Sequence, residues 1–158
     1  EGEEIVQVEE KYKAHRIILG EIRNLWTVET FEWLMKYGAD IHAKDDCALR
    51  NAAAKGHLDV VKYLLRYGAD IHSKNDYVLR CAVDNYDLDM VKCLVEQGAN
   101  VHADDDYVLC WAAEEGQLEM VKYLVKRGAD VHAQNDYALH CATHYGHLEV
   151  VAYLKALD

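Results

Sequence analysis

The chain has 158 residues, 51% of them apolar, a formal net charge of −11 at pH 7 and no proline. The length fits one ordinary domain or one short repeat array, and the apolar fraction excludes intrinsic disorder for most of the chain. The negative charge argues against nucleic acid and anionic lipid, which require clustered Lys and Arg, and favours a basic partner.

Cysteine usage and hydropathy give further expectations about the environment of the chain. The five cysteines form no Cys-x-x-Cys pair, and their neighbours are mostly apolar. We therefore expect reduced thiols and an intracellular protein. No run of about 18 apolar residues is present, so we expect no membrane-spanning segment. No signal peptide is visible, and because the first residue is Glu we expect a processed chain or a fragment.

A 30-residue unit repeats from residue 15 onward, whereas residues 1–14 match no complete unit. The motif Gly-Ala-Asp/Asn-Ile/Val-His recurs four times, and each copy is followed by a stretch that reads DDCALR, NDYVLR, DDYVLC or NDYALH. We interpret residues 1–14 as a leader or a partial preceding unit. The predicted units are 15–44, 45–74, 75–104, 105–134 and 135–158.

Each unit predicts two helices. An Asp before an alanine-rich stretch, such as Asp46, is suited to cap the first helix, and Gly56 is placed to end it. The second helix begins near Leu58, where apolar residues recur at helical spacing, and Gly68 closes it. One such pair cannot bury its apolar residues alone, so the units must stack. The sequence therefore predicts an all-α solenoid of about five helix-turn-helix units.

Two places depart from this pattern. The first unit is degenerate, although its second helix, from Val28 to Met35, fits. In the third unit Tyr86 stands where other units have Gly. Because positive φ angles are uncommon outside glycine, we expect Asn85 to adopt that conformation instead.

The stretches G-H-L-x-V-V-K-Y-L-L and G-A-D-I-H-A resemble ankyrin repeats, over most of the chain. Ankyrin units usually have about 33 residues and a Thr-Pro-Leu-His start. The 30-residue, proline-free form looks like the ankyrin arrays of giant DNA viruses of amoebae. The resemblance places the missing residues between Asp70 and Asp76, where ordinary ankyrins have a β-hairpin finger, so we expect blunted fingers. It also suggests the cytoplasm, including that of an infected host cell.

The resemblance implies a binding surface as well, because loops and first helices line the concave face of ankyrin arrays. The matching positions vary between units while the framework stays fixed, as recognition requires. Acidic residues there either bind a partner or only solvate the surface. A tyrosine column either anchors an interface or fills space left by the shorter loops. The candidate partner-binding residues are Asp45, Asn75, Tyr77, Asp84, Asp104, Asp105, Tyr107, Glu114, Glu115, Asn135, Tyr137 and Tyr145.

Histidines form a second regular column, at positions 42, 72, 102 and 132. Stacked helices lie about 8–10 Å apart and Zn–N bonds are about 2 Å, so this column does not predict a metal ladder. We expect each imidazole to brace the loop backbone. His140, His144 and His147 lie close in sequence, but His140 and His147 match structural positions of the ankyrin motif. We predict no metal site and no cofactor.

No catalytic constellation is recognisable, since the sequence has no Gly-rich phosphate loop, no nucleophile elbow and no paired catalytic carboxylates. We therefore predict a protein–protein interaction module and not an enzyme. Its expected partner is a protein of basic or mixed charge, and neither nucleic acid nor a membrane; the chain is expected to be a monomer. The alternative is a structural spacer, or a fragment of a longer array whose effector activity lies elsewhere.

Overall fold

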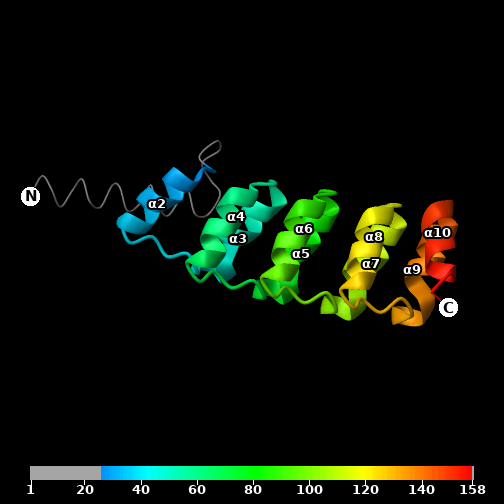
Figure 1. Cartoon of the computed structure of the whole chain (residues 1–158). Coiled ribbons are helices and arrows are strands. Elements are labelled where there is room, and N and C mark those ends of the chain that lie inside the picture. The colour runs from blue at the N-terminus through cyan, green and yellow to red at the C-terminus, as the bar shows by residue number, and fades with distance from the viewer. Residues whose placement is uncertain (1–25, 158) are drawn as a thin grey trace, which may run out of the picture.

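The structure, a computed structural model, describes residues 26–157, which form one stack of helices (Figure 1). The described residues contain helices and no strand, so the predicted all-α array is confirmed. Residues 1–14 and the start of the first unit lie outside the described part. The helices are α2 (Val28–Lys36), α3 (Ala43–Ala54), α4 (Leu58–Arg66), α5 (Ser73–Asp84), α6 (Leu88–Glu96), α7 (Ala103–Glu114), α8 (Leu118–Lys126), α9 (Ala133–His144) and α10 (Leu148–Lys155).

The second helix of each unit follows its apolar pattern. In α4, Val61 and Leu64 are buried, whereas Asp59 is exposed. The helix ends at a glycine, as predicted: Gly68 has φ +93°, and the Ala69 N–H donates to the Leu64 carbonyl at 3.0 Å. This is the Schellman motif, in which a glycine in the left-handed conformation ends the helix.

The core runs along the stack between the two layers of helices. Leu64, Leu94 and Leu124, one from each of three successive units, are fully buried, as predicted. The first helices α3, α5, α7 and α9 pack closely against one another, while contact between successive second helices is sparser. The first-helix side is therefore the shorter, inner side of the stack. We call the exposed surface of these helices and the turns before them the first-helix face.

A left-handed turn replaces the hairpin finger in each unit. Three consecutive residues at the start of every first helix have φ between 52° and 60°, for example Lys74, Asn75 and Asp76. The second and third positions of the turn are Asp or Asn in all four units, and these residues tolerate left-handed backbone better than other non-glycine residues. The expectation of a blunted finger agrees with this turn.

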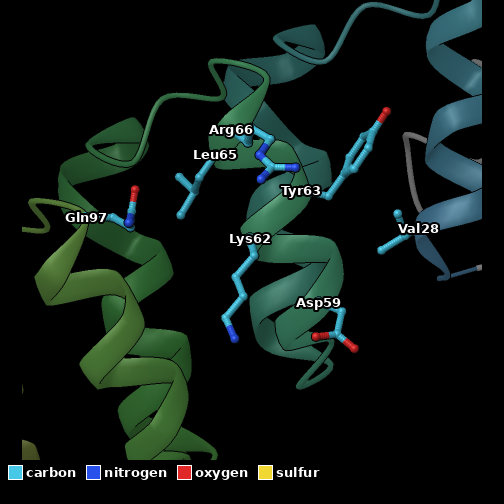
Figure 2. A pocket seen from close by; sticks show the side chains of 7 residues that line it. All are labelled: Val28, Asp59, Lys62, Tyr63, Leu65, Arg66 and Gln97. Carbon is cyan, nitrogen blue, oxygen red and sulfur yellow. The ribbon is translucent and has the colours of Figure 1, made fainter.

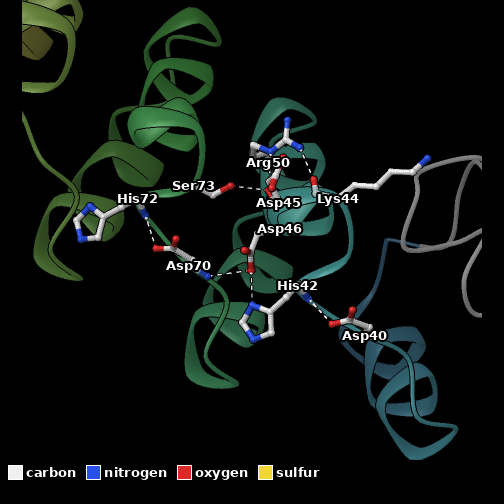
Figure 3. Close-up of polar contacts among 9 residues, drawn as sticks. All are labelled: Asp40, His42, Lys44, Asp45, Asp46, Arg50, Asp70, His72 and Ser73. Carbon is white, nitrogen blue, oxygen red and sulfur yellow. Dashed lines mark hydrogen bonds and ion pairs between the residues drawn. The ribbon is translucent and has the colours of Figure 1, made fainter.

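The sequence prediction for the Asp at the third position of each turn is wrong. The carboxylate of this Asp links two units. Asp46 Oδ1 accepts hydrogen bonds from His42 Nδ1, in the preceding unit, at 3.0 Å and from the Asp70 N–H, at the far end of its own unit, at 2.9 Å (Figure 3). The same links occur at Asp76 and Asp106. The predicted role was a cap on the Asp residue's own helix. Instead, the carboxylate joins the histidine to the following loop, so the imidazole braces the backbone indirectly.

The irregular turn of the third unit also corrects a prediction. Tyr86, and not Asn85, adopts the left-handed conformation, with φ 59°. Asn85 keeps φ −86° because its side-chain amide donates to the carbonyls of Ala53 and Ala54 in the preceding unit, at 3.2 and 3.0 Å. Tyr86 therefore adopts the positive φ angle that this turn requires.

Candidate partner-binding face

All twelve candidate residues lie on the first-helix face or at the ends of its helices. Ten are exposed and two, Glu114 and Glu115, are half-buried. The left-handed turns present Asp45, Asn75, Asp104, Asp105 and Asn135, the first helices present Tyr77, Asp84, Tyr107, Glu114 and Tyr137, and Glu115 and Tyr145 follow α7 and α9.

Successive turns are bridged to one another by polar side chains. Lys74 Nζ lies 2.7 Å from Asp45 Oδ2, and this hydrogen bond and charge lower the pKa of Asp45. The Asn75 amide donates to the Asp104 carboxylate, and Gln134 Nε2 donates to the Asp105 carbonyl at 2.9 Å. At Asp105 the bridge uses the backbone oxygen, so the Asp105 carboxylate is not neutralised by a lysine in the way Asp45 is.

Arg80 lies at the middle of the face and contacts two tyrosines. Its guanidinium is 5.0 Å from the Tyr77 ring centroid and 5.8 Å from that of Tyr107. It also lies 2.8 Å from Asp104 Oδ2. These are the distances of cation–π contacts and of a salt bridge. Tyr77 and Tyr107 stay more than a third exposed, and their rings contact an arginine.

Acidic side chains gather beside Arg80 at the ends of α5 and α7. Burial raises the pKa of Asp84, and the negative charge of Glu115 raises it further although Arg80 acts in the opposite direction. The Tyr86 hydroxyl donates to the Glu115 carboxylate, which raises the pKa of Tyr86. The structure thus brings Asp84, Glu115 and Tyr86 together across the boundary between the third and fourth units.

Glu114 points toward the fifth unit. A hydrogen bond to Glu114 and its negative charge raise the pKa of Tyr145. Trp111, one helical turn before Glu114, stacks on Tyr107 with ring centroids 6.1 Å apart. Its indole Nε1 is buried and has no hydrogen-bond partner among the described residues.

Tyr86 and Trp111 belong to this face but were not among the predicted site residues. The sequence held a signal for each, because Tyr86 replaces a repeated Gly and Trp111 stands in a column with Asn51 and two cysteines. Neither signal says where a side chain points. That direction depends on how neighbouring units stack.

The nucleophilic and metal-ligating groups of the described chain have structural roles. Burial raises the pKa of Cys110 to about 11, so its thiol stays protonated and is a poor nucleophile. His147 Nε2 is hydrogen bonded to the Glu114 carbonyl at 2.7 Å, which leaves it tied to the first-helix layer. Residues 26–157 contain no group of three or more His, Cys, Asp or Glu side chains placed to hold a metal ion.

A hollow lies on the opposite side of the stack, among second helices (Figure 2). Its lining mixes one acidic, two basic and several apolar side chains, and none of the twelve candidate residues contributes to it. The lining residues are Val28, Asp59, Lys62, Tyr63, Leu65, Arg66 and Gln97. Within the described part of the chain, no helix is long and apolar enough to cross a membrane.

Comparison with known proteins gives a family for this architecture. A family model described as ankyrin repeats (three copies) matches residues 22–75 and 78–158. The chain is 44% identical over 52 residues to ankyrin repeat protein R229 of Acanthamoeba polyphaga mimivirus, which covers 33% of this chain and 17% of that protein. It is 43% identical over 53 residues to ankyrin repeat protein R896 of the same virus, over 34% of this chain and 16% of that protein.

The match therefore spans about a sixth of the length of either relative. The relatives agree with the predicted resemblance to giant-virus arrays, and ankyrin repeats are in general protein–protein interaction modules and typically not enzymes. With the helix pairs, the 30-residue period and the matched residues taken together, this chain belongs to the ankyrin repeat family.

Proposed function

We propose that the chain binds a protein with a basic surface through its first-helix face, centred on Asp84, Asp105, Glu114, Glu115 and Tyr107. One observation carries the proposal: the carboxylates of this cluster outnumber the cations beside it, and exposed tyrosine rings lie among them. At the other end of the face, Asp45 is paired with Lys74 and Arg50 lies over Tyr77. The unbalanced charge is thus confined to the third and fourth units.

The two kinds of side chain have different expected roles. Exposed carboxylates attract a basic partner over distances of about 10 Å at 0.1 M salt, so they act mainly on the association rate. Tyrosines combine apolar area with a hydroxyl group, so they hold the complex once formed and act mainly on the dissociation rate. We place this encounter inside the cell, in the cytoplasm, because the cysteine usage fits a reducing compartment.

The test is a charge reversal with a matched control. Asp105, Glu114 and Glu115 are changed together to Lys, and the control carries Asp59, Asp89 and Glu119, exposed residues of the second helices, changed to Lys. Both variants change the net charge equally. Proteins captured from a lysate by the wild-type chain are then studied one by one by surface binding kinetics at low and moderate salt.

We expect the first variant to associate at least tenfold more slowly at low salt, while the control stays close to wild type, because steering depends on where the charge lies. Equal association rates for wild type and the first variant contradict the proposal, and then the acidic cluster only solvates the surface. If wild type and both variants capture the same proteins, the result favours the other candidate role, that of a spacer in a longer array. The short match to much longer relatives supports that role.

A further inference from the structure

The first-helix face contains an arginine-binding arrangement that the chain itself fills in one place. Between the third and fourth units, the Arg80 guanidinium lies against both Tyr77 and Tyr107 and pairs with Asp104. The side chain is largely covered, with 28% of its surface exposed. Two tyrosines one unit apart, with a carboxylate beside them, are thus sufficient in this fold to hold a guanidinium.

The tyrosine pair recurs one unit later without its arginine. The position 30 residues after Arg80 is Cys110, whose short side chain is buried, so no guanidinium separates Tyr107 from Tyr137. Tyr137 is 46% exposed, more than Tyr77 or Tyr107. The carboxylate is placed differently, because the residue 30 positions after Asp104 is Gln134. Here a carboxylate comes from Glu114 at the end of α7, whose charge acts on Tyr137 and whose side chain is hydrogen bonded to Tyr145.

The empty position is also richer in aromatic surface than the filled one. Where the filled position has Cys81, the empty one has Trp111, which stacks on Tyr107. Tryptophan is the strongest of the aromatic side chains in cation–π contacts, and arginine is the cation most often found against it. A guanidinium also stacks flat on an aromatic ring while its edge pairs with a carboxylate, which a lysine ammonium does not do.

We propose that Tyr107, Trp111, Tyr137 and Glu114 form a binding site for an arginine side chain of the partner protein. The partner's guanidinium lies among these rings, as Arg80 lies between Tyr77 and Tyr107 one unit earlier, and it pairs with the Glu114 carboxylate, because the counterpart of Asp104 here is Gln134. This inference rests on the proposed function and makes it more specific, because it names the partner group and the four residues that receive it.

The experiment uses the full chain and a small probe. N-acetyl-arginine amide is titrated into labelled protein, and the indole N–H resonance of Trp111 is followed by NMR, with Trp26 and Trp33 as internal controls. The matched probe is N-acetyl-citrulline amide, which keeps the shape and loses the charge. We expect weak, saturable binding of the arginine probe that shifts the Trp111 resonance, at least tenfold weaker binding of citrulline, and intermediate binding of the lysine analogue.

Four variants locate the site. Tyr137→Leu, at an exposed position, and Glu114→Gln, at a half-buried one, are expected to weaken arginine binding at least fivefold. Tyr77→Leu is the matched control, because Arg50 and Arg80 already contact that ring, and it is expected to leave the titration unchanged. Arg80→Ala empties the first position, so the Tyr77 ring resonances are expected to begin responding to arginine.

Equal shifts from arginine and citrulline, or a Trp111 resonance that does not respond, overturn the inference. That failure is distinguishable from failure of the proposed function. If charge reversal still slows association of a captured protein while the arginine probe leaves Trp111 unmoved, the acidic face binds its partner without this site.

Discussion

Two regions of the molecule differ in how closely equivalent positions of successive units resemble one another. At the edge where the turns meet the loops, Asp46, Asp76 and Asp106 each link a histidine of the preceding unit to an N–H of their own unit, with nearly identical distances. On the first-helix face the equivalent positions change from unit to unit: Ala54, Asp84, Glu114 and His144 occupy one column.

This difference indicates that the residues that link the helices of the stack and the residues proposed to bind a partner occupy different positions of the repeat. The edge is the same in the second, third and fourth units, because each Asp there serves the unit before it as well as its own. The first-helix face has no such constraint, since its side chains need only reach solvent or a neighbour. We therefore expect variants at the edge and in the core to change stability, and variants on the face to change binding rates.

The largest expected effect is in the core. Leu94→Ala removes a fully buried side chain from the middle unit and is expected to lower the free energy of unfolding by about 2–5 kcal/mol, through lost burial and a cavity. The matched control is Leu148→Ala, at a leucine that is 78% exposed, with an expected change within about 0.5 kcal/mol. Chemical denaturation measures both. Similar losses in the two variants contradict the burial pattern.

A second pair of variants tests the linked edge. Asp76→Ala removes the acceptor for His72 and for the Asn100 N–H, and is expected to cost about 1–3 kcal/mol because a part-buried N–H loses its partner. Asp136→Ala is the control: its carboxylate pairs with His132 but is 50% exposed, against 5% for Asp76. A smaller loss at Asp136 is expected by thermal denaturation. Equal losses show that the hydrogen bond from the Asn100 N–H to Asp76 contributes nothing.

On the face, the expected effect is kinetic. Tyr107→Ala is expected to speed dissociation of a captured partner at least fivefold, since exposed tyrosines commonly contribute more than about 1 kcal/mol at interfaces. Tyr67→Ala, at an exposed tyrosine that ends a second helix, is the control and is expected to leave the rate unchanged. Surface binding kinetics give both rates. If Tyr107→Ala lowers the free energy of unfolding as much as Leu94→Ala does, the separation between first-helix face and core is contradicted.

The smallest expected effect is a pH dependence at Asp84. Partial burial raises the pKa of Asp84 in the folded chain, because it disfavours the charged carboxylate. Above this folded pKa, the charged carboxylate lowers the stability of the fold. As the pH falls and the carboxyl is protonated, this loss of stability disappears. Asp84→Asn is therefore expected to be more stable than wild type at pH 7 by a few tenths of a kcal/mol, because the site is well exposed. Below about pH 4, near the ordinary pKa of Asp, the gain is expected to vanish. Thermal unfolding of both chains between pH 3 and 7 measures it, and a gain independent of pH contradicts this cause.

The sequence by itself determined the helix pairs, the period and the core. The local signals are apolar residues at helical spacing, such as Val61 and Leu64, and a glycine after each second helix. Because they act locally, they predict the helices without a structure. The exposed positions of the first-helix face were also legible, because they are the ones that vary between units.

Only the tertiary structure decided which groups meet across units. The Asp of each turn was predicted to cap its own helix, whereas its partner is an N–H 24 residues later, and Tyr86 holds a positive φ because Asn85 is engaged with the preceding unit. Likewise, Arg80 lies between two tyrosines that belong to different units. These contacts join distant parts of one unit or residues of neighbouring units, and sequence spacing does not give the distance and direction between two packed surfaces until packing has fixed them.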